Sequence, residues 1–116
     1  MSDDLLWAVK NGDLEQVKSL SASADVNAVL KNGRMALHYA ADFGQAEVIE
    51  YLLSIGANVD LADSYGITPL LAAIYEGHLE CVQLLVKKGA NKSLKSPDGR
   101  SYAECAEDDE IRQALQ

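Results

Sequence analysis

The sequence repeats itself every 33 residues, and this period limits the folds that the chain can adopt. Residues 33–60 align without a gap with residues 66–93. Three sets of glycines keep the same step: Gly33, Gly66 and Gly99; Gly44 and Gly77; Gly56 and Gly89. A fixed period of this length indicates an array of small structural units that stack on one another.

Each unit is predicted to contain two short helices joined by a glycine. In the third unit Thr68 is placed to cap a helix over 70–76, and Pro69 fits the first helical position, where its missing N–H is not needed. Gly77 ends this helix, and a second helix is predicted over 79–88 with apolar residues at helical spacing. Helices this short are marginal in isolation, so successive pairs must stack.

Several segments resemble the ankyrin repeat. They are Gly66-Ile67-Thr68-Pro69-Leu70, Leu37-His38-Tyr39-Ala40-Ala41, Leu52-Leu53 and Gly56-Ala57-Asn58-Val59-Asp60. The resemblance implies an all-α ankyrin-repeat solenoid of about four helix-turn-helix repeats with hairpin tips. We expect one domain over 1–116, with repeats at about 1–28, 32–64 and 65–97 and a capping half-repeat at 98–116.

The two ends of the chain depart from the pattern, as terminal repeats do because one of their faces meets water. In the first unit 5–9 aligns with 37–41, but Ser21 to Ala24 stands where other repeats have a glycine, so the path of the turn at 21–25 stays open. Near the C-terminus Ser101 is predicted to cap a helix over 102–108, followed by a short segment at 110–116. Hairpin tips are expected near 31–32, 64–65 and 97–98.

The second repeat lacks one of the helix-starting signals. It has Met35-Ala36 where the third has Thr68-Pro69, so its first helix is predicted to have no hydroxyl cap. The missing cap corresponds to about 1 kcal/mol. We expect Met35→Thr combined with Ala36→Pro to restore that stability.

Composition restricts the compartment and the kind of partner. No run approaches 18 apolar residues, and the acidic Met1-Ser2-Asp3-Asp4 start is unlike a signal peptide, so we expect a soluble, cytoplasmic protein without a membrane partner. Cys81 and Cys105 are then expected to be free thiols. Eighteen acidic against ten basic residues give a net charge of −8, which disfavours nucleic acid and suits a basic protein surface. The same charge is also compatible with a role in solubility alone.

No combination of residues predicts catalysis or a cofactor. His38 has no nucleophile pattern beside it, and at this place in the ankyrin pattern histidine makes hydrogen bonds within and between repeats. His78 and Cys81 do not form a zinc set with the remaining His and Cys. Every glycine belongs to the repeat, so there is no phosphate-binding loop. We therefore expect no enzymatic activity, no cofactor and no metal.

The predicted binding surface follows the ends of the first helices. In an ankyrin array these helices and the tips line one concave face, and the positions before the helix-ending glycine project from it. Here those positions are Lys10-Asn11, Asp42-Phe43 and Tyr75-Glu76. Exposed aromatic rings beside carboxylates are typical of a protein interface, whereas solvated helix ends are the structural alternative. Trp7 suits either the core of the first repeat or an exposed anchor.

A closer resemblance extends to positions outside the repeat consensus. The segments 7–14, 37–42, 67–71, 75–78 and 95–99 resemble a family of small ankyrin proteins that bind the heterodimeric actin capping protein. The resemblance implies an inhibitor that sequesters capping protein from filament barbed ends, is monomeric when free, and is cytoplasmic with nuclear and perinuclear pools. Its partner-binding residues would be Trp7, Asn11, Asp42, Phe43, Tyr75, Glu76 and His78. The alternative is another ankyrin adapter or inhibitor, acting on a kinase or a transcription factor.

Overall fold

The computed structural model describes residues 2–22, 25–30 and 32–116, and over these residues the chain is all-α, as predicted. The helices, in chain order, are α1 (Ser2–Asn11), α2 (Leu14–Ser21), α3 (Ala36–Asp42), α4 (Ala46–Ser54), α5 (Pro69–Tyr75), α6 (Leu79–Lys87), α7 (Tyr102–Cys105) and α8 (Asp109–Ala114). An isolated antiparallel bridge pairs Lys95 with Ser101.

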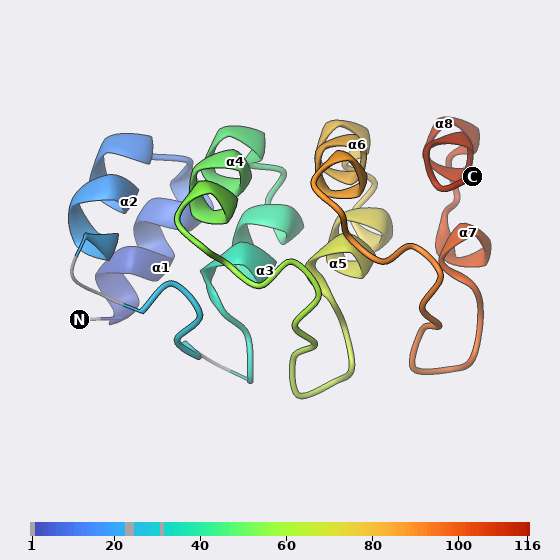
Figure 1. Ribbon diagram of the computed structural model, residues 1–116, viewed down its shortest axis with the longest axis horizontal. Helices are drawn as coiled ribbons and strands as arrows, with labels where there is room; N and C mark the ends of the chain where they lie inside the picture. Colours follow the sequence, from blue (N-terminus) through green and yellow to red (C-terminus); the bar gives the residue numbers. More distant parts are fainter. Residues whose placement is uncertain (1, 23–24, 31) are drawn as a thin grey trace.

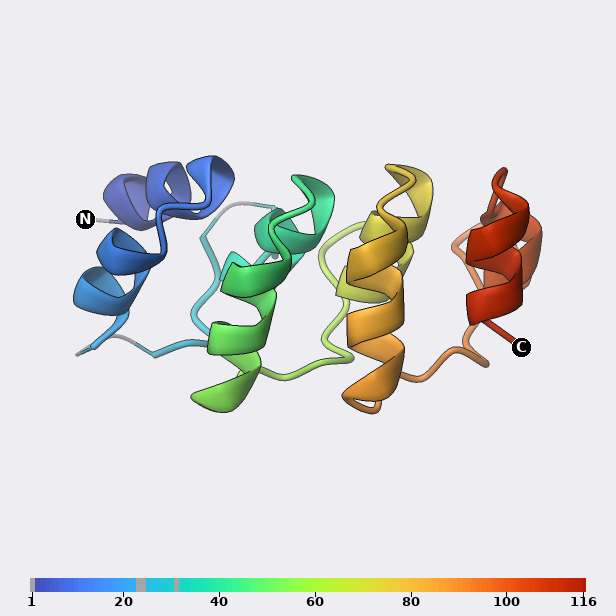
Figure 2. The same ribbon diagram turned by 90° about the horizontal axis from the view of Figure 1, so that it is seen from above.

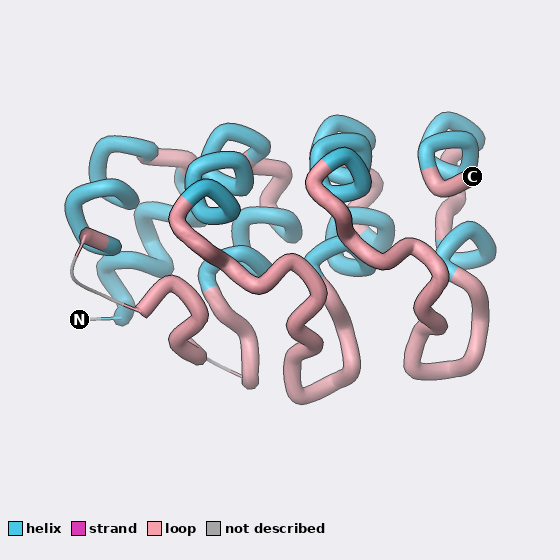
Figure 3. The backbone as a smooth tube through the Cα atoms, viewed as in Figure 1, coloured by secondary structure: helices cyan, strands magenta, loops and turns pink. Residues whose placement is uncertain are grey.

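The helices form two parallel rows along the long axis of the molecule. The first helices α1, α3, α5 and α7 make one row, the second helices α2, α4, α6 and α8 make the other, and the loops between pairs project to one side (Figures 1 and 3). Each helix packs against its partner in the pair and against its counterpart in the next pair. The chain ends lie at opposite ends of a body measuring 37 × 24 × 20 Å.

The predicted helix starts are confirmed at two repeats. The Thr68 hydroxyl accepts a hydrogen bond from the Leu71 amide at 3.3 Å, and Pro69 is the first residue of α5. Ser101 caps α7 in the same way and forms a reciprocal capping box with Glu104. These bonds satisfy amide groups that the first turn of a helix leaves without partners.

The start of α3 confirms one prediction and corrects another. Met35 provides no side-chain cap, as predicted. Its side chain is fully buried, however, so replacing it with threonine would remove apolar packing. A large-to-small change at a buried methionine costs about 2–5 kcal/mol, more than the roughly 1 kcal/mol that a cap returns. The expected benefit of Met35→Thr is therefore wrong.

The capping half-repeat also differs from the prediction. Helix α7 ends at Cys105 and does not continue to Asp108. Asp108 instead caps α8, because its carboxylate accepts the Glu110 amide at 2.7 Å. Arg112 Nε donates to the carbonyl of Ala106 at 3.0 Å, which holds the break between the two helices. A carboxylate that starts the next helix therefore ends the previous one early.

The core is a continuous apolar layer between the two rows of helices, and its residues come from every repeat. Cys81 and Cys105 are buried free thiols, as predicted. Burial, and next the neighbouring Glu80, raise the pKa of the Cys81 thiol to about 11, so this group stays protonated at neutral pH. In the described part of the chain no helix has the length and hydropathy needed to span a bilayer.

Two predicted features fall on residues that are outside the described ranges. The turn at 21–25 includes residues 23 and 24, and the first hairpin tip includes Lys31. The next residue, Asn32, has a φ of 55°, and its carbonyl accepts a hydrogen bond from the Ser64 amide at 2.9 Å. This bond joins the first tip directly to the second. The boundaries of the repeats at 1–28, 32–64 and 65–97 stay a prediction.

Candidate functional site

The ends of the first helices lie along one edge of the molecule. Seen from above, the short links from α1 to α2, α3 to α4 and α5 to α6 follow the same side of the stack (Figure 2). The residues at these ends are Lys10, Asn11, Asp42, Phe43, Tyr75 and Glu76, which we call the helix-end row. The six residues that the sequence placed in phase therefore lie beside the same set of links.

Most of the helix-end row is at the surface. Asn11 and Glu76 are exposed, and the two aromatic residues, Phe43 and Tyr75, keep 45% and 44% of their surface accessible. Burial, and next the adjacent Cys105 thiol, raise the pKa of the Tyr75 hydroxyl. The Tyr75 hydroxyl therefore lies next to the last half-repeat, to which Cys105 belongs. Exposed aromatic rings of this kind are the residues that contribute most at protein interfaces.

On this face, a lysine of the first repeat makes cation–π contacts with aromatic rings of the second repeat. Lys10 Nζ lies 5.4 Å from the centroid of the Phe43 ring and 5.7 Å from that of Tyr39. Both distances are within the range of cation–π attraction, which contributes about 0.5–1 kcal/mol at exposed sites. The ammonium group of the first repeat therefore contacts two aromatic rings of the second.

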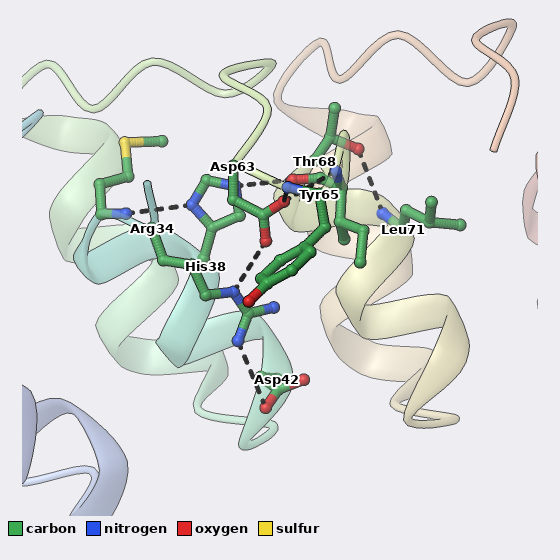
Figure 4. A network of polar contacts seen from close by, with 9 residues as sticks. Arg34, His38, Asp42, Asp63, Tyr65, Thr68 and Leu71 are labelled. Carbon is green, nitrogen blue, oxygen red and sulfur yellow. Dashed lines mark hydrogen bonds and ion pairs between the residues drawn. The ribbon is translucent and has the colours of Figure 1, made fainter. Parts of the chain in front are cut away.

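Arg34 organises the centre of the site, and the sequence analysis missed it. Its Nε donates to Asp63 Oδ2 at 3.0 Å, and its Nη1 lies 3.7 Å from Asp42 Oδ2 (Figure 4). Its guanidinium carbon is 5.2 Å from the centroid of the Tyr39 ring. Asp63 is buried and also accepts the amides of Tyr65 and Ile67 at 2.9 and 3.0 Å.

The ion pair changes the electrostatics of Asp42. The Asp42 side chain keeps 28% of its surface accessible, and its negative charge faces the positive charge of Arg34. The sequence analysis placed Asp42 on the binding surface but did not predict this ion pair within the chain. The signal available in the sequence was the position of Arg34 directly after the Asn32-Gly33 tip, in phase with Arg100.

His38 makes hydrogen bonds within and between repeats, as predicted. Its Nδ1 accepts the Met35 amide at 3.2 Å, and its Nε2 lies 2.9 Å from the carbonyl of Ile67 in the next repeat (Figure 4). Because Nδ1 accepts, the proton is on Nε2, which donates to Ile67. Burial lowers the pKa of this imidazole, which keeps the ring neutral.

His78 joins two repeats through the backbone. Its ring is half-buried, and Nε2 lies 3.0 Å from the carbonyl of Asp42. The ring also covers Gly44, where an added Cβ would come within 2.8 Å of Nδ1, so glycine is required there for space as well as for its φ of 72°. Contact between His78 and a partner stays a prediction.

Trp7 is at the surface, which removes the core alternative. It keeps 71% of its surface accessible, and its carbonyl accepts a hydrogen bond from Asn11 Nδ2 at 2.8 Å. Both residues border a hollow of about 360 Å³ between α1 and α2, which is lined by Asp4, Trp7, Ala8, Asn11, Asp13, Gln16 and Leu20. The outer end of the stack thus presents an indole ring with carboxylates around it.

The described residues contain no group of three His, Cys, Asp or Glu side chains arranged to hold a metal ion. The geometry of the site combines exposed aromatic rings, carboxylates and ordered cations, which is the chemistry of protein binding.

Comparison with known proteins indicates the same fold and identifies a relative that aligns over nearly the whole of both chains. A family model described as ankyrin repeats (3 copies) matches residues 5–96. Myotrophin from Xenopus tropicalis is 52% identical over 113 residues, which cover 97% of this chain and 96% of that protein. The E3 ubiquitin-protein ligase KEG from Arabidopsis thaliana is 38% identical, but the alignment covers 87% of this chain and 7% of the ligase. The putative palmitoyltransferase ZDHHC13 from Danio rerio is 39% identical over 85% of this chain and 15% of that protein.

Proposed function

The chain belongs to the ankyrin-repeat family and, within it, to the family of myotrophin, and from this premise we propose that it binds and sequesters the heterodimeric actin capping protein. Capping protein held in this complex would be kept from filament barbed ends, so filament growth would be regulated by stoichiometric binding without catalysis. We place this activity in the cytoplasm, with nuclear and perinuclear pools, and expect the free protein to be a monomer.

The similarity to myotrophin over nearly the whole of both chains carries this proposal. A similarity confined to the repeat consensus would favour any ankyrin adapter equally, because fold alone does not specify a partner. The net charge of −8 adds support, since an acidic protein associates readily with a basic surface.

The exposed residues of the helix-end row have distinct roles in this proposal. Tyr75 would bury its ring in the partner, while the exposed carboxylate of Glu76 pairs with a lysine or an arginine. Asp42 would contribute its charge through the pair that it forms with Arg34. Neighbouring contacts would come from Trp7, Asn11, Phe43 and His78.

A combined Asp42→Asn, Tyr75→Ala and Glu76→Gln variant tests the proposed surface. We expect it to weaken capping protein binding at least about tenfold, or 1.4 kcal/mol, because it removes two charges and an aromatic anchor. The affinity is measured by isothermal titration calorimetry, and function by release of barbed-end growth in a fluorescent actin assay that contains capping protein.

The matched control carries the same kinds of change on α4 and at its end: Glu47→Gln, Glu50→Gln and Ile55→Ala. These residues are exposed and lie outside the helix-end row. The control should bind within about twofold of wild type. Unchanged affinity in the first variant would rule out the helix-end row as the binding surface. In a pulldown from cytosol, recovery of a kinase or a transcription factor in place of both capping protein subunits would favour the adapter alternative.

A further inference from the structure

Two junctions between repeats are closed by a hydrogen-bond donor at the start of a second helix. Gln45 precedes α4, and its Nε2 donates to the carbonyl of Lys10 at 2.9 Å. His78 precedes α6, and its Nε2 lies 3.0 Å from the carbonyl of Asp42. Each side chain reaches the end of the first helix in the preceding repeat and covers the glycine that follows it.

The third junction has no such donor. The corresponding residue before α8 is Asp108, whose carboxylate accepts the Glu110 amide and takes the place of the donor found at the other two junctions. Among the described residues no hydrogen bond reaches the Tyr75 carbonyl, which is the counterpart of the carbonyls of Lys10 and Asp42. A Cβ added at Gly77 would meet no atom within 4 Å, whereas one at Gly44 would strike the covering histidine.

The uncovered junction forms a hollow of about 380 Å³. It is lined by Ile74, Tyr75, Glu76, Gly77, Glu107, Asp108 and Ile111. Ile74 and Ile111 are buried at its base, while Tyr75 and the three acidic residues are exposed. None of the ion pairs found within the described ranges involves Glu76, Glu107 or Asp108.

We propose that this hollow binds an arginine side chain presented by the protein partner. The inference rests on the proposed function for the identity of that partner and extends the helix-end row onto the capping half-repeat. A guanidinium has five N–H donors, no acceptor and a flat face that stacks on aromatic rings. It therefore matches carboxylates, an open carbonyl and the Tyr75 ring better than the single charged point of a lysine.

A variant with Glu107→Gln and Asp108→Asn removes two of the three charges. Asparagine is as good a helix cap as aspartate, so α8 keeps its start, and removing like charges leaves the melting temperature equal or higher. The matched control is Glu47→Gln with Glu50→Gln, which changes the net charge equally at exposed positions of α4, outside the hollow.

Nuclear magnetic resonance titration with blocked Gly-Arg-Gly and Gly-Lys-Gly peptides tests the hollow without capping protein. With the arginine peptide we expect saturable shifts of the amides of Gly77, Glu107 and Asp108 in wild type and in the control. The shifts should be at least about threefold smaller in the Glu107→Gln, Asp108→Asn variant and with the lysine peptide. No saturable shift, or an equal response to both peptides, would overturn the assignment.

Affinity for capping protein separates this inference from the proposed function. If wild type does not bind capping protein, the proposed function fails and the peptide titration still decides the hollow. If wild type binds, the Glu107→Gln, Asp108→Asn variant should bind about tenfold more weakly, and the control within about twofold. Equal binding by that variant would overturn a role for the hollow in this complex.

Discussion

At the scale of single residues, the site depends on side chains that the fold holds in one protonation state or one pairing. His38 accepts a backbone amide from its own repeat and donates to the carbonyl of Ile67 in the next. Arg34 and Asp63 are the charged groups beside it. The ankyrin pattern predicted bonds within and between repeats, but the tautomer follows only from the positions of both partners.

Protonation of His38 should destabilise the fold. The pKa of His38 is lowered from 6.5, first by burial, so the unfolded chain binds the proton more tightly than the folded chain. The stabilisation that the neutral His38 ring provides is then complete at pH values above the pKa of His38 in the unfolded chain. It is lost as the pH falls from about 7 toward the pKa in the folded chain. Urea unfolding at several pH values should show this loss in wild type. The His38→Leu variant, which copies Leu71 of the next repeat, should show a shallower dependence, and equal slopes would contradict the explanation.

Replacing Arg34 should be costly because Asp63 would be left as a buried, unpaired charge. Asp63 exposes 1% of its side chain, so we expect Arg34→Met to lower the free energy of unfolding by about 3 kcal/mol. Arg100 occupies the same repeat position, but its pair with Asp98 is solvent-exposed, and Arg100→Met should cost less than about 0.5 kcal/mol. Chemical denaturation of the two variants gives the comparison. Equal losses would show that the Arg34 network adds nothing beyond a surface ion pair.

At the scale of elements, local signals in the sequence predicted the helix pairs well. The glycine positions, the Thr68 and Ser101 caps and the first residue of α6 all agree with the structure. The early end of α7 was missed because Asp108 and Arg112 act on the backbone from the following helix. Arg34 was missed because its partner Asp63 lies 29 residues away, beyond the range of a helical pattern.

The first helix of the second repeat can be stabilised by one substitution. Ala36 is the first residue of α3 and corresponds to Pro69 in α5, and Met35 before it is extended, with φ −95° and ψ 174°. This backbone accepts a following proline. Ala36→Pro should raise the free energy of unfolding by about 0.4–1 kcal/mol, whereas Met35→Thr should lower it. Thermal and urea unfolding of the single variants measure both changes, and a destabilised Ala36→Pro protein would mean that the helix start is misplaced.

At the scale of the whole molecule, stacking of the helix pairs places the ends of the first helices along one edge. The 33-residue period predicts that these positions lie in one row, because each repeat contributes the same position to the surface. The period could not predict that Asp42 is paired with Arg34, or that the last junction stays open. Both features depend on residues that differ between repeats.

Hydrogen–deuterium exchange of the chain, free and bound to capping protein, tests the helix-end row most directly. We predict slower exchange on binding in peptides that cover residues 7–11, 42–43, 75–78 and 107–108, and unchanged exchange at 47–55 on the outer face of α4. Protection confined to the second helices, or no protection along the row in a complex that does form, would contradict the proposal that this edge is the binding surface.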